Sequence, residues 1–342
     1  MNIRSPSGEK VVRSRVTCST ILSETPKDPL QLMTALKSSP RYSGHETFVC
    51  RYAWLPKVVK ELSTKDGASL FKDEDAAMVR LGVGKNMVRS AKFWAEAAQI
   101  IEEIPTGHRV TSFGTRLLGY EGHDAYLERL QTLWLLHWKI ATNPFRPIFH
   151  WTQMLSHWHR AEFGEAEANA FLERGLSPEQ AKRSKRTLSD GLKVFINSYV
   201  PSKGRKGEIA EDNLDCPLTE LDLIQVVGER LTTDNHREKI YSFNKEPKPA
   251  ITSALLAYCI DEFWRNSLYA DDESLGFRPI STGENSPGQV FKLPEASIRA
   301  LLESISTTTQ GAISFEESQS MQQLWRKRTV DPVDRLDAIY PF

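Results

Sequence analysis

The segment from Ser43 to Arg51 carries the densest group of side chains that could do chemistry. It reads Ser-Gly-His-Glu-Thr-Phe, and Arg51 follows two residues later. His45 can serve as a general base or as a metal ligand. Glu46 can hold a metal or orient a histidine, and the guanidinium of Arg51 can clamp a phosphate.

Two interpretations of this cluster stay open. Cleavage of a phosphodiester needs a nucleophile, neutralisation of the phosphate charge and usually a divalent metal. His45, Glu46 and Arg51 are the only compact set in the sequence that offers a base, a ligand and a clamp, so they are our catalytic candidates, with Mg²⁺ or Mn²⁺ as the metal. The alternative is that His45 and Glu46 hydrogen-bond locally and fix the segment. The sequence favours this alternative, because no second catalytic motif accompanies the cluster.

A second series of polar and aromatic residues invites a metal-site interpretation: His137, Trp138, His150, Trp151, His157, Trp158 and His159. Two residues apart on a helix, His157 and His159 point to different faces. No HExxH pattern completes a zinc site. We therefore predict aromatic packing with hydrogen-bonded histidines. Neither GxxxxGK[ST] nor GxGxxG occurs, so we expect no nucleotide cofactor.

Basic residues gather locally although the chain as a whole is neutral. There are 44 Lys and Arg against 44 Asp and Glu, so any attraction to nucleic acid must come from local clusters. The stretch 85–92 has three basic residues and no acid, and the stretch 182–206 has eight against one acid. The residues that we expect to contact DNA are Lys85, Asn86, Arg89, Lys92, His108, Arg109, Lys182, Arg183, Lys185 and Arg186.

The elements around the first basic cluster indicate a winged helix-turn-helix. A short helix over 73–81 ends at Gly82-Val83-Gly84, and an amphipathic helix follows from 85 or 86 to 98. A strand over 100–104, a turn at 105–108 and a strand over 109–111 complete the order. Such a module places its second helix in a DNA groove. The alternative is an ordinary pair of helices with a packing hairpin beside it, or a protein-contact module.

The remaining chain predicts a mainly α protein with short β-hairpins, and small α+β subdomains after the winged helix-turn-helix. We expect a disordered tail over 1–40, the winged domain over 41–122, a helical domain over 123–206 and an α+β domain over 207–342. Further helices are expected at 53–62, 113–118, 124–138, 148–158, 165–174, from 177 onward, 250–264, 294–305 and 316–326. Short strands are expected at 290–293 and 312–315.

Composition predicts that the protein is cytoplasmic. The 342 residues include four cysteines without a CxxC pair, which suits free thiols in a reducing compartment. No run of eighteen apolar residues occurs, and the first forty residues lack an apolar signal core. We therefore expect no membrane association.

Five segments resemble one bacterial family. In chain order they are SGHETFVCRYAWLPK, LGVGKNMVRSAKFWAEAAQII, WLLHWKIAT, CPLTELDLI and SPGQVFKL. They resemble the SspB-like nickase components of Ssp-type DNA phosphorothioation defence systems, a family catalogued as a domain of unknown function. The resemblance implies binding of double-stranded DNA, a nick in one strand, and partnership with an ATPase and sulfur-transfer proteins of the same operon. It assigns no catalytic residue.

Three functions stay open from the sequence. The first is a DNA nickase of a phosphorothioation system, which would be a metal-dependent endonuclease. The second is a DNA-binding adaptor that uses the same winged helix without chemistry. The third is a transcriptional regulator that reads an operator.

Overall fold

Residues 39–177, 180, 185–201, 216–231, 235, 237–318 and 321–340 are described by the computed structural model of the protein. The predicted tail up to residue 38, and the basic positions Lys182 and Arg183, lie outside these residues. Helices predominate in the described part, and its three sheets are antiparallel. The predicted class, a mainly helical protein with short hairpins, is confirmed.

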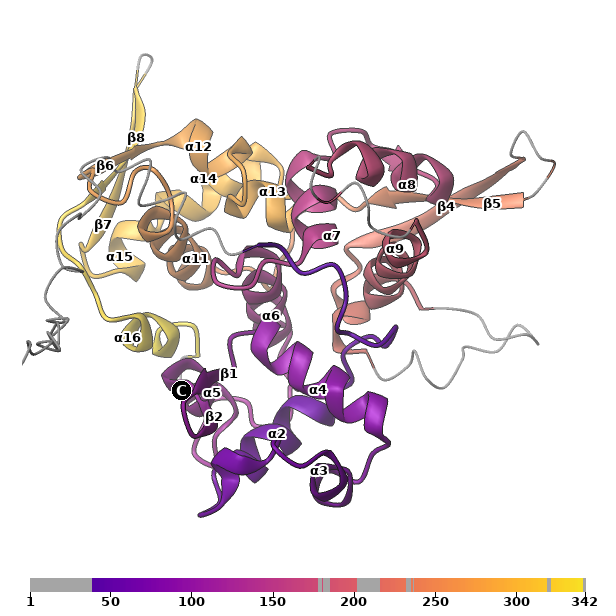
Figure 1. The fold of residues 1–342 in the computed structure, drawn as a ribbon. Helices are drawn as coiled ribbons and strands as arrows, with labels where there is room; N and C mark the ends of the chain where they lie inside the picture. Colours follow the sequence, from indigo (N-terminus) through magenta and orange to yellow (C-terminus); the bar gives the residue numbers. More distant parts are fainter. Residues whose placement is uncertain are drawn as a thin grey trace, which may run out of the picture. The chain divides into compact units, whose positions relative to one another are not determined.

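The first part of the fold is a run of short helices with a hairpin (Figure 1). Helix, glycine turn, second helix and antiparallel hairpin follow in the predicted order, and α4 packs against α2 and α3. The elements are α2 (Trp54–Leu62), the 3-10 turn η1 (Gly67–Ser69), α3 (Glu74–Leu81), α4 (Lys85–Ala97), β1 (Ile101–Ile104), β2 (Gly107–Val110) and α5 (Ser112–Leu118).

The limits of α3 have local causes. The carboxylate of Asp73 accepts hydrogen bonds from the backbone N–H groups of Asp75 and Ala76, at 3.0 and 3.2 Å, and so begins the helix. Gly82 ends it in the left-handed conformation, with φ of 68°. A residue with a Cβ would pay about 1–2 kcal/mol for that conformation. Gly84 has φ of −69°, so the turn depends on one of its two glycines.

One face of α4 is buried and the other is exposed, as its three- and four-residue spacing predicts. The buried face includes Val88, Ala91, Trp94 and Ala95. The indole Nε1 of Trp94 donates a hydrogen bond to the carbonyl of Phe48 at 3.1 Å. This bond ties α4 to the segment that holds the catalytic candidates.

Helix α6 (Leu130–Thr142) is buried on all sides. It contacts α4, α7 (Phe149–Thr152), the 3-10 segment η3 (Pro217–Leu221), α11 (Ser253–Arg265) and α13 (Pro287–Phe291). Every residue from Thr132 to Ala141 is buried, as expected of a helix that is apolar all round.

Two of the histidines of this region, His137 and His150, pack as predicted, whereas His157 is half-buried and His159 is exposed. The imidazole of His137 in α6 hydrogen-bonds the Tyr199 hydroxyl at 2.7 Å and the Val290 carbonyl at 2.9 Å. In α7, Nε2 of His150 lies 3.0 Å from the Leu188 carbonyl. Both imidazoles are therefore hydrogen-bonded parts of the core.

The start of α6 differs from the prediction of a helix that begins at Asp124. The Asp124 carboxylate accepts hydrogen bonds from the backbone N–H groups of Glu128 and Arg129, at 2.8 and 2.9 Å, and closes a turn. Leu127 within this turn has φ of 62°. This left-handed residue prevents a continuous helix, and α6 begins only at Leu130.

The middle part combines helices with a small sheet. Its strands lie in the order β3 (Glu162–Phe163), β5 (Arg237–Phe243) and β4 (Ile224–Leu231), and β4 and β5 form the long hairpin of Figure 1. Its helical elements are α7, the π-helical turn η2 (Gln153–His157), α8 (Glu165–Arg174) and α9 (Lys185–Tyr199).

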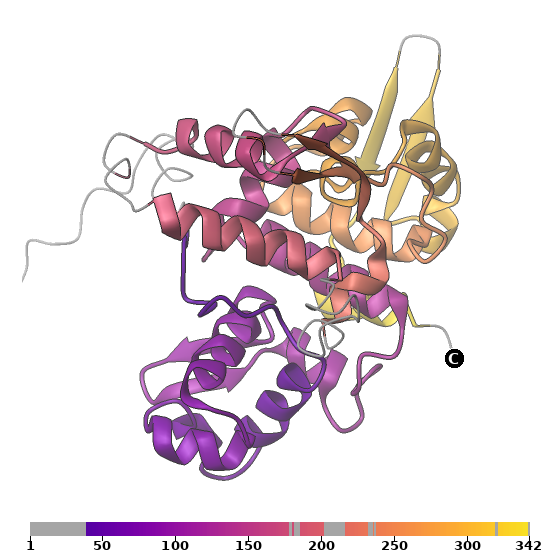
Figure 2. The ribbon, with the colours of Figure 1, turned by 90° about the vertical axis from the view of Figure 1, so that its right-hand side faces the viewer.

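The last part contains two departures from the predicted elements. Residues 290–293 do not form a strand, because the Ser286 hydroxyl accepts a hydrogen bond from the backbone N–H of Gln289 at 3.3 Å and begins α13. The described residues between 316 and 326 do not form the predicted helix. They contain the end of β7 (Ile313–Glu317) and all of β8 (Gln322–Arg326), which pairs with β7 and with the distant β6 (Ser274–Gly276) (Figure 2). The other helices here are α12 (Phe277–Thr282), α14 (Glu295–Glu303), α15 (Ile305–Thr308) and α16 (Pro332–Asp337).

Residues Ser38–Phe342 belong to one compact unit. The boundaries expected after residues 122 and 206 stay predictions. The described cysteines, Cys50, Cys216 and Cys259, are buried free thiols. Among the described residues, no helix has the length and apolar character to cross a membrane.

Candidate nucleic-acid interface

Basic side chains form a row on the exposed face of α4. Lys85, Arg89 and Lys92 follow one another at steps of four and three residues, which places them on the same side of the helix. The side chains of Lys85 and Arg89 are 53% and 45% exposed. Asn86 lies exposed beside them in the first turn. We call these four residues the basic ridge.

Glu74 of α3 partly neutralises the basic ridge. Its carboxylate lies 2.8 Å from Nζ of Lys85 and 2.6 Å from Nε of Arg89. The hydrogen bonds from Arg89 and then Lys85 lower the pKa of Glu74 to about 2. Lys85 and Arg89 thus share the Glu74 carboxylate in solvent, whereas Nζ of Lys92 lies 3.9 Å from the buried Glu96. The positive charge that remains on this face of α4 suits a phosphate backbone.

The ridge ends at a buried ionic cluster around Glu96, one turn beyond Lys92. Glu96 is 7% exposed and accepts hydrogen bonds from Arg41 at 3.0 Å and Arg146 at 2.7 Å, while Nε2 of His108 lies 3.2 Å away. Burial raises the pKa of Glu96, but the His108 hydrogen bond and the charges of Arg146 and Arg41 outweigh it, so the pKa is lowered. The ionised cluster joins α4, the β1–β2 hairpin and the two segments that contain Arg41 and Arg146.

The β1–β2 hairpin presents Arg109 to solvent. Nε of Arg109 pairs with the Glu102 carboxylate across the hairpin at 2.7 Å. His108, the preceding residue, is 6% exposed and faces Glu96. His108, which we expected to contact DNA, therefore faces the protein interior, because successive strand residues point to opposite faces.

The catalytic candidates lie on a loop that packs against α4. Gly44 has φ of 113°, and a Cβ at this position would lie 2.9 Å from Cδ2 of Phe93. The ring of His45 meets the ring of Phe93 edge-on, with 5.6 Å between centroids. The loop is thus held against the side of α4, next to the basic ridge.

His45 is buried and neutral. Its Nδ1 accepts a hydrogen bond from the backbone N–H of Thr47 at 3.1 Å, which puts the ring proton on Nε2. In the described part of the chain, Nε2 has no hydrogen-bond partner. Burial lowers the pKa of His45 to about 4. An imidazole with this pKa is a weak general base at neutral pH.

Glu46 and Arg51 lie in surroundings different from that of His45. Glu46 is half-buried. The pKa of Arg89 is raised mainly by its hydrogen bond to Glu74, and the negative charge of Glu46 raises it further. The guanidinium of Arg51 lies over the ring of Trp54, 5.5 Å from its centroid. The structure therefore brings Glu46 beside the basic ridge and Arg51 onto an aromatic surface.

The second basic cluster begins at α9. The side chains of Lys185 and Arg186 are 85% and 89% exposed. They lie 3.5 Å from Glu173 and 3.6 Å from Asp190, respectively. Exposed pairs of this kind contribute little to stability, so both cations can exchange a carboxylate for a phosphate.

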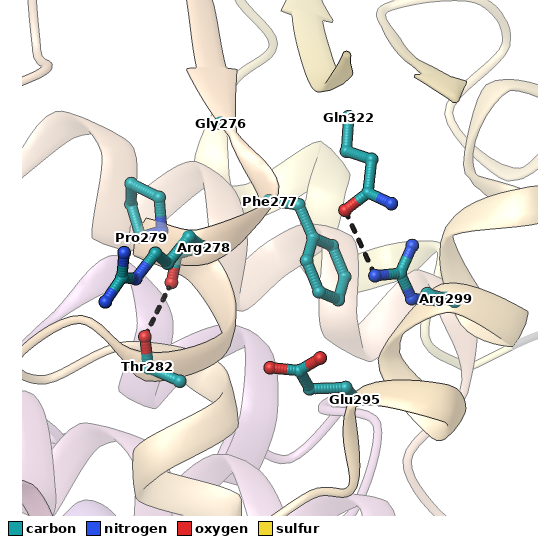
Figure 3. Close-up of a pocket in the computed structure, with 8 residues that line it drawn as sticks. All are labelled: Gly276, Phe277, Arg278, Pro279, Thr282, Glu295, Arg299 and Gln322. Carbon is teal, nitrogen blue, oxygen red and sulfur yellow. Dashed lines mark hydrogen bonds between the residues drawn. The ribbon is translucent and has the colours of Figure 1, made fainter. Parts of the chain in front are cut away.

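A metal cluster or the larger cavity could offer an alternative active site. Within the described ranges, no group of three or more His, Cys, Asp or Glu residues could hold a metal ion, and we derive no metal-dependent step. A cavity of about 610 Å³ opens between α12, α14 and β8 (Figure 3). There the Arg299 guanidinium lies 4.3 Å from the Phe277 ring centroid and donates to Gln322 at 3.0 Å. These contacts hold the guanidinium in the cavity wall.

Comparison with known families and structures places this fold. Residues 42–340 match the family model described as a protein of unknown function, DUF4007. The chain belongs to the DUF4007 family. A search of curated proteins gave no match.

Solved SspB structures share this DUF4007 fold. A magnesium ion-bound SspB crystal structure has 25% sequence identity and a TM-score of 0.74, over 89% of this chain and 88% of that chain. A second SspB crystal structure has 24% identity and a TM-score of 0.72, over 89% of each chain. The expected resemblance to SspB is confirmed.

Sequence reasoning missed the two carboxylates that shape this face of the DUF4007 chain. Glu96 follows Lys92 by four residues, and this spacing could have suggested a pair. Its main partners, Arg41 and Arg146, are distant in sequence. Glu74 reaches Arg89 across the turn between α3 and α4, and no sequence spacing marks that contact.

Proposed function

We propose that this protein is the DNA-binding component of an Ssp-type DNA phosphorothioation system, which defends bacteria against phage. It binds duplex DNA through a winged helix-turn-helix, with α4 as the recognition helix and the β1–β2 hairpin as the wing. The observation that carries the proposal is the basic ridge, exposed on α4 in a chain with the fold of SspB.

The dimensions of the ridge suit a DNA groove. Lys85 and Lys92 are seven residues apart, which corresponds to about 10 Å along a helix. The major groove is about 12 Å wide and admits an α-helix. Because the chain has no net charge, a few local phosphate contacts must supply its affinity, and this favours binding that partner proteins strengthen.

Salt-dependent DNA binding tests this assignment. We expect the double variant Arg89→Ala with Lys92→Ala to bind duplex DNA more weakly in fluorescence anisotropy. The slope of log affinity against log salt should fall by about two, since each lost phosphate contact removes about one. The matched control is Lys327→Ala with Arg328→Ala, an exposed basic pair away from α4. Equal slopes for both double variants and the unaltered protein would reject the ridge.

Glu74→Gln should act in the opposite direction. In the free protein Glu74 holds Lys85 and Arg89, and DNA must displace it. Removing its charge frees both cations, so we expect tighter DNA binding with a steeper salt slope. Weaker binding would mean that Glu74 positions the ridge rather than competing with DNA.

Nicking of one strand is the catalytic part of the proposal. The effect of the Glu46 charge on Arg89 and the packing of His45 on Phe93 of α4 support it. Supercoiled plasmid with Mg²⁺ or Mn²⁺ should become relaxed circles, with the protein alone or with the ATPase and sulfur-transfer proteins of the system. His45→Ala and Glu46→Gln should abolish relaxation but keep the salt slope of binding, whereas His157→Ala serves as a histidine control. Persistent nicking in both variants would place the chemistry elsewhere.

A non-catalytic adaptor is the second candidate. The low pKa of His45 favours it, as does the lack of a three-ligand metal cluster within the described residues. The adaptor predicts salt-dependent DNA binding with no relaxed product under any of these plasmid conditions. A regulator would instead bind its own promoter far more tightly than unrelated duplexes.

A further inference from the structure

A small cavity in the last part of the chain gathers cationic side chains. Its volume is about 290 Å³, and it lies between the segment after η2, the end of β5 and helices α12 to α14. His159, Arg160, Lys245 and Lys292 line it, together with the carboxylate of Glu295. Arg160, Lys245 and Lys292 come from three separate stretches of the chain, so the tertiary fold brings these cations together.

Lys292 is the buried member of this group, with 7% of the residue exposed. Its Nζ donates a hydrogen bond to the Leu155 carbonyl at 2.6 Å and lies 4.5 Å from the centroid of the Phe243 ring. Both partners are uncharged, so neither balances the ammonium charge. Burial, and to a smaller extent the charge of Lys245, lowers the pKa of Lys292 to about 7.

The backbone holds Lys292 in place. Lys292 follows the last residue of α13 and adopts the left-handed conformation, with φ of 54°. The carbonyl that it contacts, that of Leu155, belongs to the π-helical turn η2. Single π-helical turns occur frequently at functional sites, because they displace backbone groups from the regular helical pattern.

The other charged groups leave an excess of positive charge at the cavity. Arg160 forms an ion pair with Glu167, and Glu295 accepts a hydrogen bond from the Ser281 hydroxyl at 3.2 Å. Lys245 is exposed at the cavity mouth and repels Lys292. An anion between the two ammonium groups would remove this repulsion and hydrogen-bond both.

We propose that this cavity binds a phosphate group, either inorganic phosphate or the terminal phosphate of a nucleotide or DNA end. Its volume is at the lower end of small-ligand sites, which span about 300–1,000 Å³. It can therefore take a single phosphate with its attached group but not a duplex. A terminal phosphate carries a charge of about −1.5 to −2 at pH 7. This charge would favour the protonated form of Lys292, so both lysines would face the phosphate as cations. This site is independent of the DNA-binding ridge on α4.

Titration calorimetry of the full chain with inorganic phosphate tests the site, with potassium chloride at equal ionic strength as the reference titrant. We expect saturable binding that Lys245→Gln weakens at least about tenfold, as expected for a lost charge-assisted hydrogen bond. Lys292→Met should weaken it similarly. The matched control is Lys239→Gln, an exposed lysine of β5 that does not line the cavity.

Further arms distinguish the phosphate source and the two surfaces. A 5′-phosphorylated oligonucleotide that competes with phosphate, where its 5′-hydroxyl form does not, would identify a DNA end as the ligand. Competition by neither form would identify free phosphate. The variant Arg89→Ala with Lys92→Ala should keep its affinity for phosphate. The proposals for the ridge and for the cavity can therefore be rejected separately.

If calorimetry shows no saturable heat of phosphate binding, the proposal is wrong. It is also wrong if Lys245→Gln binds phosphate as tightly as the unaltered protein. Lys245 is exposed, so this variant remains decisive even if Lys292→Met does not fold.

Discussion

Replacement of Glu96 by glutamine should destabilise the protein strongly. Glutamine keeps the shape of the side chain but removes the charge that balances Arg41 and Arg146. Arg41 is largely buried, with 19% of its side chain exposed. Arg146 is 41% exposed and keeps Glu103 as a second partner at 2.6 Å. The main cost therefore comes from Arg41.

The size of the effect follows from these surroundings. Removing one partner of a buried ion pair costs about 3–5 kcal/mol, and the remaining partner of Arg146 places Glu96→Gln near 3 kcal/mol. The entropy of unfolding is about 2.1 cal/mol/K per residue, so a chain of 342 residues loses about 1.4 °C per kcal/mol. We therefore expect the unfolding midpoint to fall by about 4 °C.

Thermal and urea unfolding of matched variants measures this effect. Glu74→Gln is the control, since Glu74 also pairs with two basic side chains, but in solvent. It should leave the midpoint close to that of the unaltered protein. An equal loss of stability in Glu74→Gln and Glu96→Gln would refute the reasoning, because burial would then not decide the cost.

Two further predictions concern the turn before α4 and the response to acid. Gly82→Ala should cost about 1–2 kcal/mol in urea unfolding because of its positive φ, whereas Gly84→Ala in the same turn should cost much less; equal costs would contradict the turn geometry. Burial lowers the pKa of His45 and His137 to about 4 and that of His150 to about 3. Unfolded histidines titrate near 6.5, so between about pH 6.5 and 4 the unfolded chain binds more protons than the folded chain. The free energy of unfolding therefore decreases as the pH is lowered, by up to about 1.4 kcal/mol per pH unit for each histidine. A urea midpoint that is the same at pH 7.5 and pH 5 would show that these imidazoles are accessible to protons.

The elements around α4 could be predicted because their causes are local. The cap at Asp73, the glycine turn and the spacing of buried residues in α4 all lie within a few residues of what they determine. The hairpin that follows was predictable for the same reason. Periodicity and capping together specified the order of elements that the proposed DNA contact requires.

The later elements were not predictable where their partners are distant. Strand β8 looks like part of a helix in the sequence, and its pairing with β6 is visible only in the folded chain. Residue 127 breaks the expected start of α6 through a backbone conformation that a leucine rarely adopts.

The candidate site shows the same division. The basic ridge could be predicted from helical spacing alone. The burial of His108 and the pairing of Arg41 with Glu96 depend on contacts between segments far apart in sequence. The cavity that contains Lys292 likewise joins three separate stretches of the chain.

Site-specific photo-crosslinking tests most directly whether the exposed face of α4 contacts duplex DNA. A benzophenone amino acid at Asn86, in the first turn of α4, should crosslink to duplex DNA, and the yield should fall as salt is raised. The same group at Leu268, which is 68% exposed and away from α4, should give little product. DNA binding without crosslinks from position 86, or with equal yields from both positions, would contradict the account.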